Sequence, residues 1–441
     1  MKKFLISALC AVGIAAMSLP AFAVEHEFGG YWRTRAYTQK DFWPNGASDL
    51  SVVDTRTRLY YTAKFSENFK FVNKFEFNTI WGDDDGGDIG ADGKNDWRVK
   101  NSYVDMTFCD WNVKVGIQGA TYARGFLFDD DFSGISLTYK GNGFTIPFVW
   151  MMAVEGGEGY NTTTGKKNET YDVEYYFINP SFDYNENIKV NPFFMWVRSQ
   201  DLSEYADRYA GAQLNFPGYI SGATTGLDSA DLYYLGLNMD FDYDAFSLWF
   251  TGIYMFGSME YEKGWGRDKG YDVKAFLVAL GGEADLGPFS VHAQTFYATG
   301  DDNDLNDYKM EAFVAPVGQS YVWSEIMGHR TFDDYESFNA PGEYPSNIWA
   351  VNLGATMKPV EKWTVEADLW YAQTAEDVDT WDSTVLNRKQ DDKLGFEIDL
   401  AATYQIFDNM NIRFVGAYLF ADDATGDDDP WLLGTQLEFS F

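Results

Sequence analysis

The chain contains little cysteine, little histidine and, after its first 23 residues, no long apolar run. Two cysteines and three histidines occur among 441 residues, and the formal net charge is −34. This acidity excludes a typical nucleic-acid-binding protein, which needs Lys and Arg to displace counterions from phosphates. A membrane-spanning helix needs an apolar stretch of about 18 residues, so none is predicted beyond residue 23. The three histidines are scattered and do not have the spacing of a zinc site.

Aromatic residues, by contrast, are abundant. The chain has 15 Trp, 29 Tyr and 36 Phe, which make up 18% of it. A disordered acidic chain would be poor in aromatic residues, so that class is excluded as well. Two classes remain: a large soluble β protein, and a transmembrane β-barrel, whose alternating strands do not raise the mean hydropathy.

The first 23 residues have the pattern of a secretory signal peptide. A basic start, Met1-Lys2-Lys3, precedes an apolar core, and Ala21-Phe22-Ala23 forms a cleavage site. We expect cleavage after residue 23, which leaves residues 24–441 as a single barrel domain. Cys109 is then the only cysteine, and one cysteine cannot form an intrachain disulfide.

The mature chain repeats a strand, a tight turn, a strand and a loop. Apolar and polar residues alternate over 53–65 and again over 69–77, which predicts two half-buried strands joined by a turn at 66–68. The Gly- and Asp-rich stretch 82–96 cannot supply a core and is predicted to be a solvated loop.

This pattern continues to the end of the chain and predicts a closed barrel of about 18 antiparallel strands. Further tight turns are predicted at 110–111, 141–143, 184–187, 242–244, 286–288, 359–361 and 408–409. Long acidic loops are predicted at 41–51, 82–96, 121–131, 156–169, 201–230, 259–270, 300–347, 375–393 and 421–429. Short turns on the periplasmic rim and long loops outside are typical of outer-membrane barrels. Residues 208–216 are assigned to a loop to keep the strand number even, and 16 strands would also fit the sequence.

The last strand carries the most specific signal. Apolar residues alternate from Trp431 to Phe439, and Phe441 ends the chain. A final amphipathic strand with Phe439 and Phe441 resembles the signal that the barrel assembly machinery of Gram-negative bacteria reads, although an ordinary edge strand could also end in Phe. In hydrocarbon every backbone N–H and C=O needs a partner, and barrel closure removes the sheet edges. We therefore expect a multi-pass barrel surrounded by outer-membrane lipid.

If the apolar faces of the strands contact lipid, their polar faces point into the lumen. A Lys or Arg on the lipid side would cost about 2–4 kcal/mol at the membrane midplane. The predicted pore-lining residues form a basic set and an acidic set. They are Arg33, Arg35, Arg56 and Arg58, and Asp54, Glu366, Asp368, Glu397 and Asp399. Opposed rows of charge could select the permeating ion, or they could form inter-strand salt bridges.

Acidic runs in the loops suggest a second kind of site. Asp83, Asp85, Asp302 and Asp304 are candidate calcium ligands, because hard cations bind several carboxylates on a flexible loop. A solvated acidic surface that attracts cations to the mouth explains the same runs. No other metal or cofactor is predicted.

Three segments near the N-terminus resemble a known family. They are Gly29-Gly30-Tyr31-Trp32-Arg33-Thr34-Arg35, Asp54-Thr55-Arg56-Thr57-Arg58-Leu59-Tyr60 and Phe75-Glu76-Phe77. The match resembles outer-membrane porins of the alginate-export type, and the layout is similar to outer-membrane channel proteins of anaerobic metal-respiring bacteria. The resemblance implies a monomeric barrel of 18 strands with an arginine-rich, selective lumen. General porins are often homotrimers, so both states remain open.

Three functions are compatible with these residues. The first is a channel for passive diffusion of small hydrophilic solutes or ions, in which the loop 300–347 folds into the pore and narrows it. The second is a barrel that holds partners, for example electron-transfer proteins at the surface. The third is an outer-membrane hydrolase built on Ser290 and His292, which lie on the same face of one strand. The first is favoured, and no enzyme is predicted.

Overall fold

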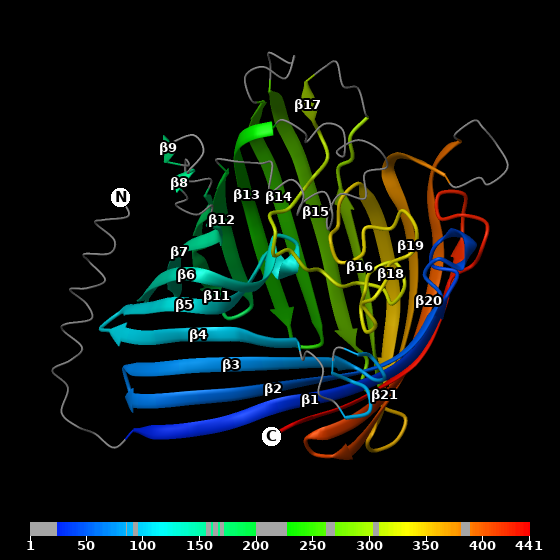
Figure 1. Ribbon diagram of the computed structural model, residues 1–441, viewed down its shortest axis with the longest axis horizontal. Coiled ribbons are helices and arrows are strands. Elements are labelled where there is room, and N and C mark those ends of the chain that lie inside the picture. Colours follow the sequence, from blue (N-terminus) through cyan, green and yellow to red (C-terminus); the bar gives the residue numbers. More distant parts are fainter. Residues whose placement is uncertain are drawn as a thin grey trace.

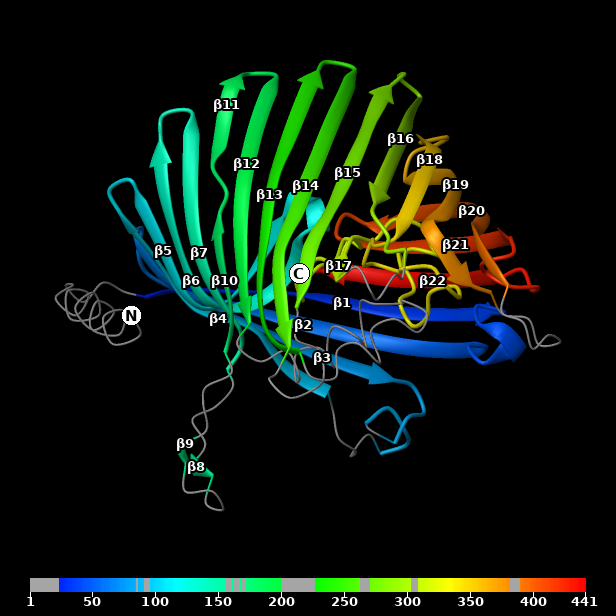
Figure 2. The same ribbon diagram turned by 90° about the horizontal axis from the view of Figure 1, so that it is seen from above.

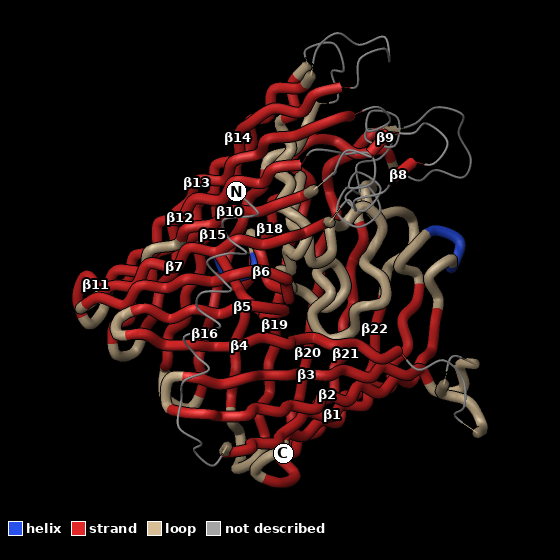
Figure 3. The backbone as a smooth tube through the Cα atoms, turned by 60° about the vertical axis from the view of Figure 1, so that its left-hand side comes forward, coloured by secondary structure: helices blue, strands red, loops and turns tan. Residues whose placement is uncertain are grey.

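The structure is a computed structural model. It describes residues 24–84, 86–90, 96–155, 160–161, 166–167, 172–199, 227–261, 270–302, 308–380 and 389–441. Figure 3 shows that this part of the chain consists of strands and loops, with two short 3-10 turns, η1 (Pro44–Gly46) and η2 (Ala123–Gly125). No helix in the described ranges is long and apolar enough to cross a membrane.

Eighteen antiparallel barrel strands close into one sheet, as the sequence predicted (Figures 1 and 2). Each pairs with its neighbour in the chain, and the last pairs with the first. Counting β10 and β11 as one strand, they are β1 (Glu25–Lys40), β2 (Leu50–Ser66), β3 (Phe69–Ile80), β4 (Asp96–Phe108), β5 (Trp111–Tyr122), β6 (Phe128–Gly141), β7 (Phe144–Val154), β10 (Val173–Ile178) with β11 (Ser181–Asn185), β12 (Ile188–Ser199), β13 (Leu227–Tyr243), β14 (Phe246–Tyr261), β15 (Tyr271–Asp285), β16 (Phe289–Ala298), β18 (Ile348–Met357), β19 (Trp363–Asp379), β20 (Gln390–Phe407), β21 (Met410–Ala421) and β22 (Trp431–Ser440).

Three two-residue strands lie outside this series. β8 (Tyr160–Asn161) pairs with β9 (Lys166–Lys167) within the connection after β7, and β17 (Lys309–Met310) pairs in parallel with β15. The eighth barrel strand is interrupted between β10 and β11 at Pro180, which has no N–H to donate to the ladder. Both pieces still pair with β7 and β12, so the break does not open the barrel.

The eight predicted tight turns all join consecutive strands. Two predicted loops are shorter than the sequence suggested. The loop predicted at 121–131 covers only residues 123–127, because β5 ends at Tyr122 and β6 begins at Phe128. The loop predicted at 375–393 covers only residues 380–389, because β19 ends at Asp379 and β20 begins at Gln390. Asp is depleted in strands, yet here Asp129, Asp130 and Asp131 pair with β5 across the ladder at the strand end. Residues 208–216 lie outside the described residues.

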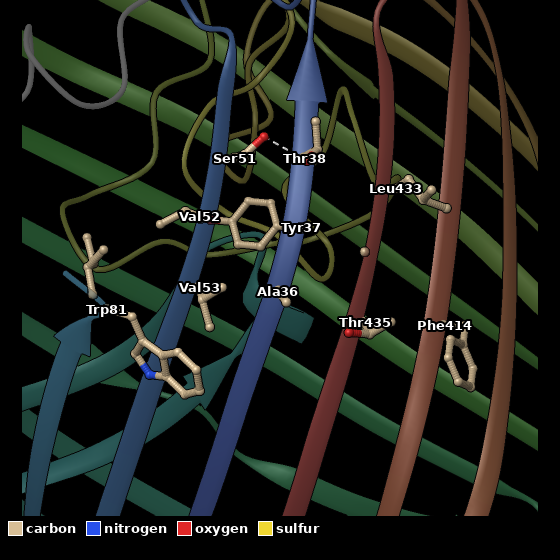
Figure 4. A pocket seen from close by; sticks show the side chains of 12 residues that line it. Ala36, Tyr37, Thr38, Ser51, Val52, Val53, Trp81, Phe414, Leu433 and Thr435 are labelled. Atoms are coloured by element: carbon tan, nitrogen blue, oxygen red, sulfur yellow. Dashed lines mark hydrogen bonds between the residues drawn. The ribbon is translucent and has the colours of Figure 1, made fainter. Parts of the chain in front are cut away.

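The two faces of the barrel wall are distinct. Along β20, Phe396, Ile398 and Leu400 are exposed on the outside, whereas Glu397 and Asp399 are buried on the inside. A groove of about 710 Å³ lies on the outer face of β1, β2 and β22, and Figure 4 shows side chains that line it. No charged residue lines this groove, and the hydroxyl groups of Thr38 and Ser51 hydrogen-bond each other at 2.8 Å. An apolar outer surface with paired hydroxyls is compatible with lipid.

The inner wall does not follow the predicted rule everywhere. On one side of the barrel, from β10 to β16, the inward residues are apolar as well. They include Tyr175, Met195, Tyr234, Met255, Leu277 and Phe296, all buried. The expectation that polar residues face inward is therefore wrong for these strands, because other parts of the chain cover their inner face, whereas their outer face is apolar and exposed as expected.

Candidate functional site: a narrowed barrel interior

The connection between β16 and β18 spans 299–347 and is called the long segment; of its described residues, 308–347 fold into the barrel. Figure 2 shows this segment, in yellow, within the ring of strands. Its apolar side chains Trp323, Met327 and Phe332 are at most 2% exposed, so the predicted folding of the loop 300–347 into the pore is what the structure has. Trp323 packs edge-on against Trp370 of β19, with 5.0 Å between ring centroids, and Phe332 stacks on Tyr37 of β1 at 4.4 Å. The segment thus contacts strands on both sides of the seam where the barrel closes.

A second, shorter segment reaches into the interior from the connection between β5 and β6. Arg124 in η2 donates a hydrogen bond to Asp240 of β13 at 2.6 Å, and Phe126 stacks on Tyr321 at 3.7 Å between centroids. A Cβ atom on Gly125 would lie 2.2 Å from the carbonyl oxygen of Ser320, so glycine is needed for this close approach. The segments 123–127 and 299–347 therefore pack together and cover the apolar inner face of β10–β16.

On β1, the predicted lumen residue Arg35 anchors the long segment. Its guanidinium contacts Asp54 of β2 at 2.7 Å and Asp333 at 2.5 Å, and donates to the carbonyl oxygen of Thr331 at 2.8 Å. Burial acts to raise the pKa of Asp333, but the Arg35 guanidinium outweighs it and holds that pKa below its usual value. The anchor is therefore an ion pair at neutral pH.

Replacing Arg35 with Gln should loosen residues 330–334. The expected loss in docking free energy is about 1–3 kcal/mol, less than for a fully buried pair because the Asp333 side chain is half exposed. The lowered pKa means that Asp333 favours docking above its ordinary pKa and loses this contribution as the pH falls through the lowered value. Hydrogen exchange of the backbone amides of 330–334 measures both effects. Lys40→Gln, which removes an exposed ion pair from the same strand, is the control, and equal exchange in both variants would contradict the anchor.

The acidic residues of β19 contact cations from three different elements. Glu366 pairs with Arg413 of β21 at 2.6 Å and with Arg330 of the long segment at 3.6 Å. Asp368, which is 5% exposed, pairs with Arg330 at 3.1 Å and hydrogen-bonds to His292 at 2.6 Å. Arg330 thus pairs with both acidic residues of β19 that the sequence placed in the lumen.

The acidic residues of β20 are covered by the backbone of the long segment. Glu397 accepts hydrogen bonds from the amides of Ile326 at 2.6 Å and Met327 at 3.0 Å, and from the Ser324 hydroxyl at 3.0 Å. Asp399 accepts from the Glu325 amide at 3.2 Å. These two carboxyl groups, at 0% and 3% exposure, face inward but are shielded from water.

The remaining basic residues of β1 and β2 form a row on the inner face. Arg33 pairs in register with Arg56 on the same face as the anchored Arg35. Arg58 donates to Glu76 of β3 at 2.6 Å, and Arg56 donates to Asn78 at 2.9 Å. Although they are inside the barrel, the side chains of Arg56 and Arg58 remain 25% and 27% exposed. Water therefore reaches this part of the interior.

A cavity of about 400 Å³ lies against the opposite side of the long segment. Aromatic rings of Trp249, Tyr321, Trp323 and Trp370 line it together with the charged groups of Glu283, His292, Arg330 and Asp368. The interior is thus water-accessible on both sides of the segment 321–330. Because the segments 123–127 and 299–347 occupy part of the interior, the open passage is narrower than the ring of 18 strands.

Solved structures share this architecture. OccK9 (OpdG) of Pseudomonas aeruginosa superimposes with a TM-score of 0.57 at 12% identity, over 95% of this chain and 98% of that chain. OccK1 (OpdK) gives 0.56 at 11% identity, over 95% and 98%. The outer membrane protein OprD of the same organism gives 0.54 at 13% identity, over 96% and 95%. The shared property is the barrel fold. No family model matches the chain, and no curated protein matches it in sequence.

The hydrolase candidates Ser290 and His292 do not form a catalytic pair. His292 hydrogen-bonds to Asp368, as the histidine of a triad bonds to its acid, but among the described residues no hydrogen bond links the Ser290 hydroxyl to the His292 ring. Of the candidate calcium ligands, Asp85 and Asp304 lie outside the described residues, and no cluster of three or more potential metal ligands occurs within the described ranges. Cys109 is a free thiol in the exposed turn between β4 and β5.

Several residues of the site were missed by the sequence reasoning. They are Arg124, Ser324, Glu325, Arg330 and Arg413. The partners of Arg330 lie more than 30 residues away along the chain, so no local pattern indicates them. Only Arg413 could have been predicted from the sequence. It lies within a strand, and a charged side chain on a strand of a lipid-surrounded barrel is expected to point into the lumen.

Proposed function

We propose that this chain is an outer-membrane channel through which small hydrophilic solutes or ions diffuse passively. The observation that carries the proposal is the water exposure of Arg56 and Arg58 on the inner face of a closed barrel. A barrel of about 18 strands is wide enough to enclose an aqueous lumen. The segments 123–127 and 299–347 narrow this lumen, and lipid surrounds the outer face.

The residues that act on the solute are, in this proposal, the basic row Arg33, Arg56 and Arg58. The acidic residues Asp368, Glu397 and Asp399 hold the long segment against the wall, because they are buried beneath it. OpdK of Pseudomonas aeruginosa, a barrel of the same fold, was solved with vanillate, a small aromatic carboxylate. That structure, and the arginine-rich motifs that resemble those of alginate-export porins, support a lumen that interacts with anionic solutes.

Replacing Arg56 and Arg58 together with Gln should shift the ion preference toward cations. Removing two positive charges from the lumen lowers the local anion concentration and raises that of cations. The reversal potential in a salt gradient across a planar bilayer measures the change. Lys274→Gln, which removes a positive charge from the outer face of β15, should leave the potential unchanged.

Two results would contradict the proposal. An unchanged reversal potential in the double variant would remove the basic row from the permeation path. A folded, inserted barrel that carries no current would contradict the channel itself and favour a barrel that holds partners. Folding is checked independently by the shift in gel migration that a closed barrel shows on heating.

A further inference from the structure

The turn 324–331 of the long segment docks on Glu397 and Asp399 of β20 and brings a third carboxyl group, Glu325, to them; none of the three pairs with a cation of the described residues. Glu325 is 1% exposed, Glu397 is 0% and Asp399 is 3%. Glu397 and Asp399 lie two residues apart on the inner face of β20, and Glu325 lies on the turn that covers them. Three buried carboxylates in one place would repel one another strongly, because the surroundings have a low dielectric constant.

The nearby cations are already engaged elsewhere. Arg330 pairs with Glu366 and Asp368 of β19, Arg413 of β21 pairs with Glu366, and His292 of β16 bonds to Asp368. Of the described residues, no Lys, Arg or His is within ion-pair distance of Glu325, Glu397 or Asp399. The field of Arg330 and Arg413 reaches Glu325, but it does not replace a direct partner.

A proton relieves the repulsion between Glu397 and Asp399. Glu397 accepts hydrogen bonds from three donors of the turn, and Asp399 lies two residues away on the same inner face of β20. Ionised carboxylates only accept hydrogen bonds, so two such groups can hydrogen-bond each other only if one of them carries a proton. The Asp399 Oδ1 atom receives no N–H or hydroxyl hydrogen bond from the described residues, which leaves a place for that proton.

We infer that the turn 324–331 is a proton-dependent latch: it stays docked on β20 while Glu397 and Asp399 share a proton, and it is released as the pH rises. Burial raises the pKa of Glu325 in spite of Arg330, so Glu325 also favours its neutral form in the docked turn, and it adds to the repulsion once it ionises. Because the docked state binds more protons than the released state, docking weakens with increasing pH. Release of the turn should widen the lumen at alkaline pH, and this consequence rests on the proposed channel function.

Hydrogen exchange of the backbone amides of residues 325–327 tests the latch without requiring current. In the purified barrel, the protection factors of these amides should fall about tenfold per pH unit over the range in which the docked pair keeps its proton and the released pair has lost it, since one proton is released on opening. In Asp399→Asn, the amide takes the place of the protonated acid and donates to Glu397. Its protection factors should therefore stay high and independent of pH.

Two further variants and a control complete the experiment. Glu397→Gln replaces one accepting oxygen by an NH₂ group that faces the donors of the turn, so protection should be low at every pH. Glu325→Gln should move the release to higher pH, because one of the repelling carboxylates is gone. Glu283→Gln, an exposed inward acid of the same interior, should behave like the wild type.

Pairing the exchange data with bilayer conductance separates the two proposals. Conductance that rises with pH in the wild type but not in Asp399→Asn supports the latch. Protection that does not depend on pH in the wild type, or that falls equally in Asp399→Asn, overturns it. A barrel that conducts at no pH while its amides still show the pH-dependent release would overturn the channel and leave the latch standing.

Discussion

Replacing residues 300–346 by a short turn should raise the single-channel conductance severalfold. Ala298 and Ile348 are paired neighbours on β16 and β18, so a tight turn can join the two strands without distorting the ladder. The deletion removes Trp323, Met327 and Phe332 from the interior. The conductance of a water-filled barrel depends on its free cross-section, which the strand number would then set.

The deletion should also lower stability. It exposes inward apolar residues such as Met255, Leu277 and Trp370 to water, and fully burying an apolar side chain is worth about 1.5–3 kcal/mol. Urea unfolding followed by tryptophan fluorescence measures this cost. Trp323→Ala, which only removes the ring packed on Trp370 and Phe296, should give a smaller increase in conductance. Unchanged conductance in the deletion variant would show that the segment does not restrict the passage.

Introducing a single methyl group at Gly30 should interfere with closure of the barrel. The amide of Gly30 donates to the carbonyl of Phe441 at 2.9 Å, and the Phe441 amide donates back at 3.1 Å. A Cβ atom at Gly30 would lie 2.3 Å from the Phe441 ring and 2.7 Å from the backbone oxygen of Arg58. The ring can move, but the Arg58 carbonyl belongs to the β1–β2 ladder and cannot move without breaking it.

We expect Gly30→Ala to cost about 1–3 kcal/mol, as overpacking typically does, and to reduce the yield of folded barrel. Gly416→Ala on β21 is the matched control, because its nearest neighbour would be a Leu433 side-chain atom at 3.6 Å, an ordinary contact. Urea unfolding and the heat-dependent gel shift measure both variants. Equal stability of the two would contradict a special role for Gly30 in seating the C-terminal Phe441.

Two opposed pH dependences act on the long segment. The Arg35–Asp333 anchor weakens in acid, because Asp333 must be ionised to pair. The proposed latch on Glu397 and Asp399 weakens in alkali, because it needs a shared proton. Docking should therefore be strongest between these limits, and Asp399→Asn should extend the docked range on the alkaline side only.

The sequence by itself determined the barrel. Alternation with a period of two, eight tight turns and an even strand count are local properties, since each strand must satisfy its backbone against its neighbours and present an apolar face to lipid. The inward direction of Arg33, Arg35, Arg56 and Arg58 followed from the same rule, because charge is costly on the lipid side. An even number of strands then requires the last strand, β22, to pair antiparallel with β1 and close the barrel.

Tertiary structure alone decided what fills the barrel. The strands from β10 to β16 are apolar on both faces. The pattern of apolar and polar residues along these strands therefore does not indicate which face the segment 299–347 covers. Glu397 is held by backbone amides of residues 326 and 327, and backbone donors leave no trace in side-chain identity. Arg330 meets Asp368 only because a long loop folds back across the interior. Contacts between distant segments depend on the path of that loop, and only the folded chain specifies it.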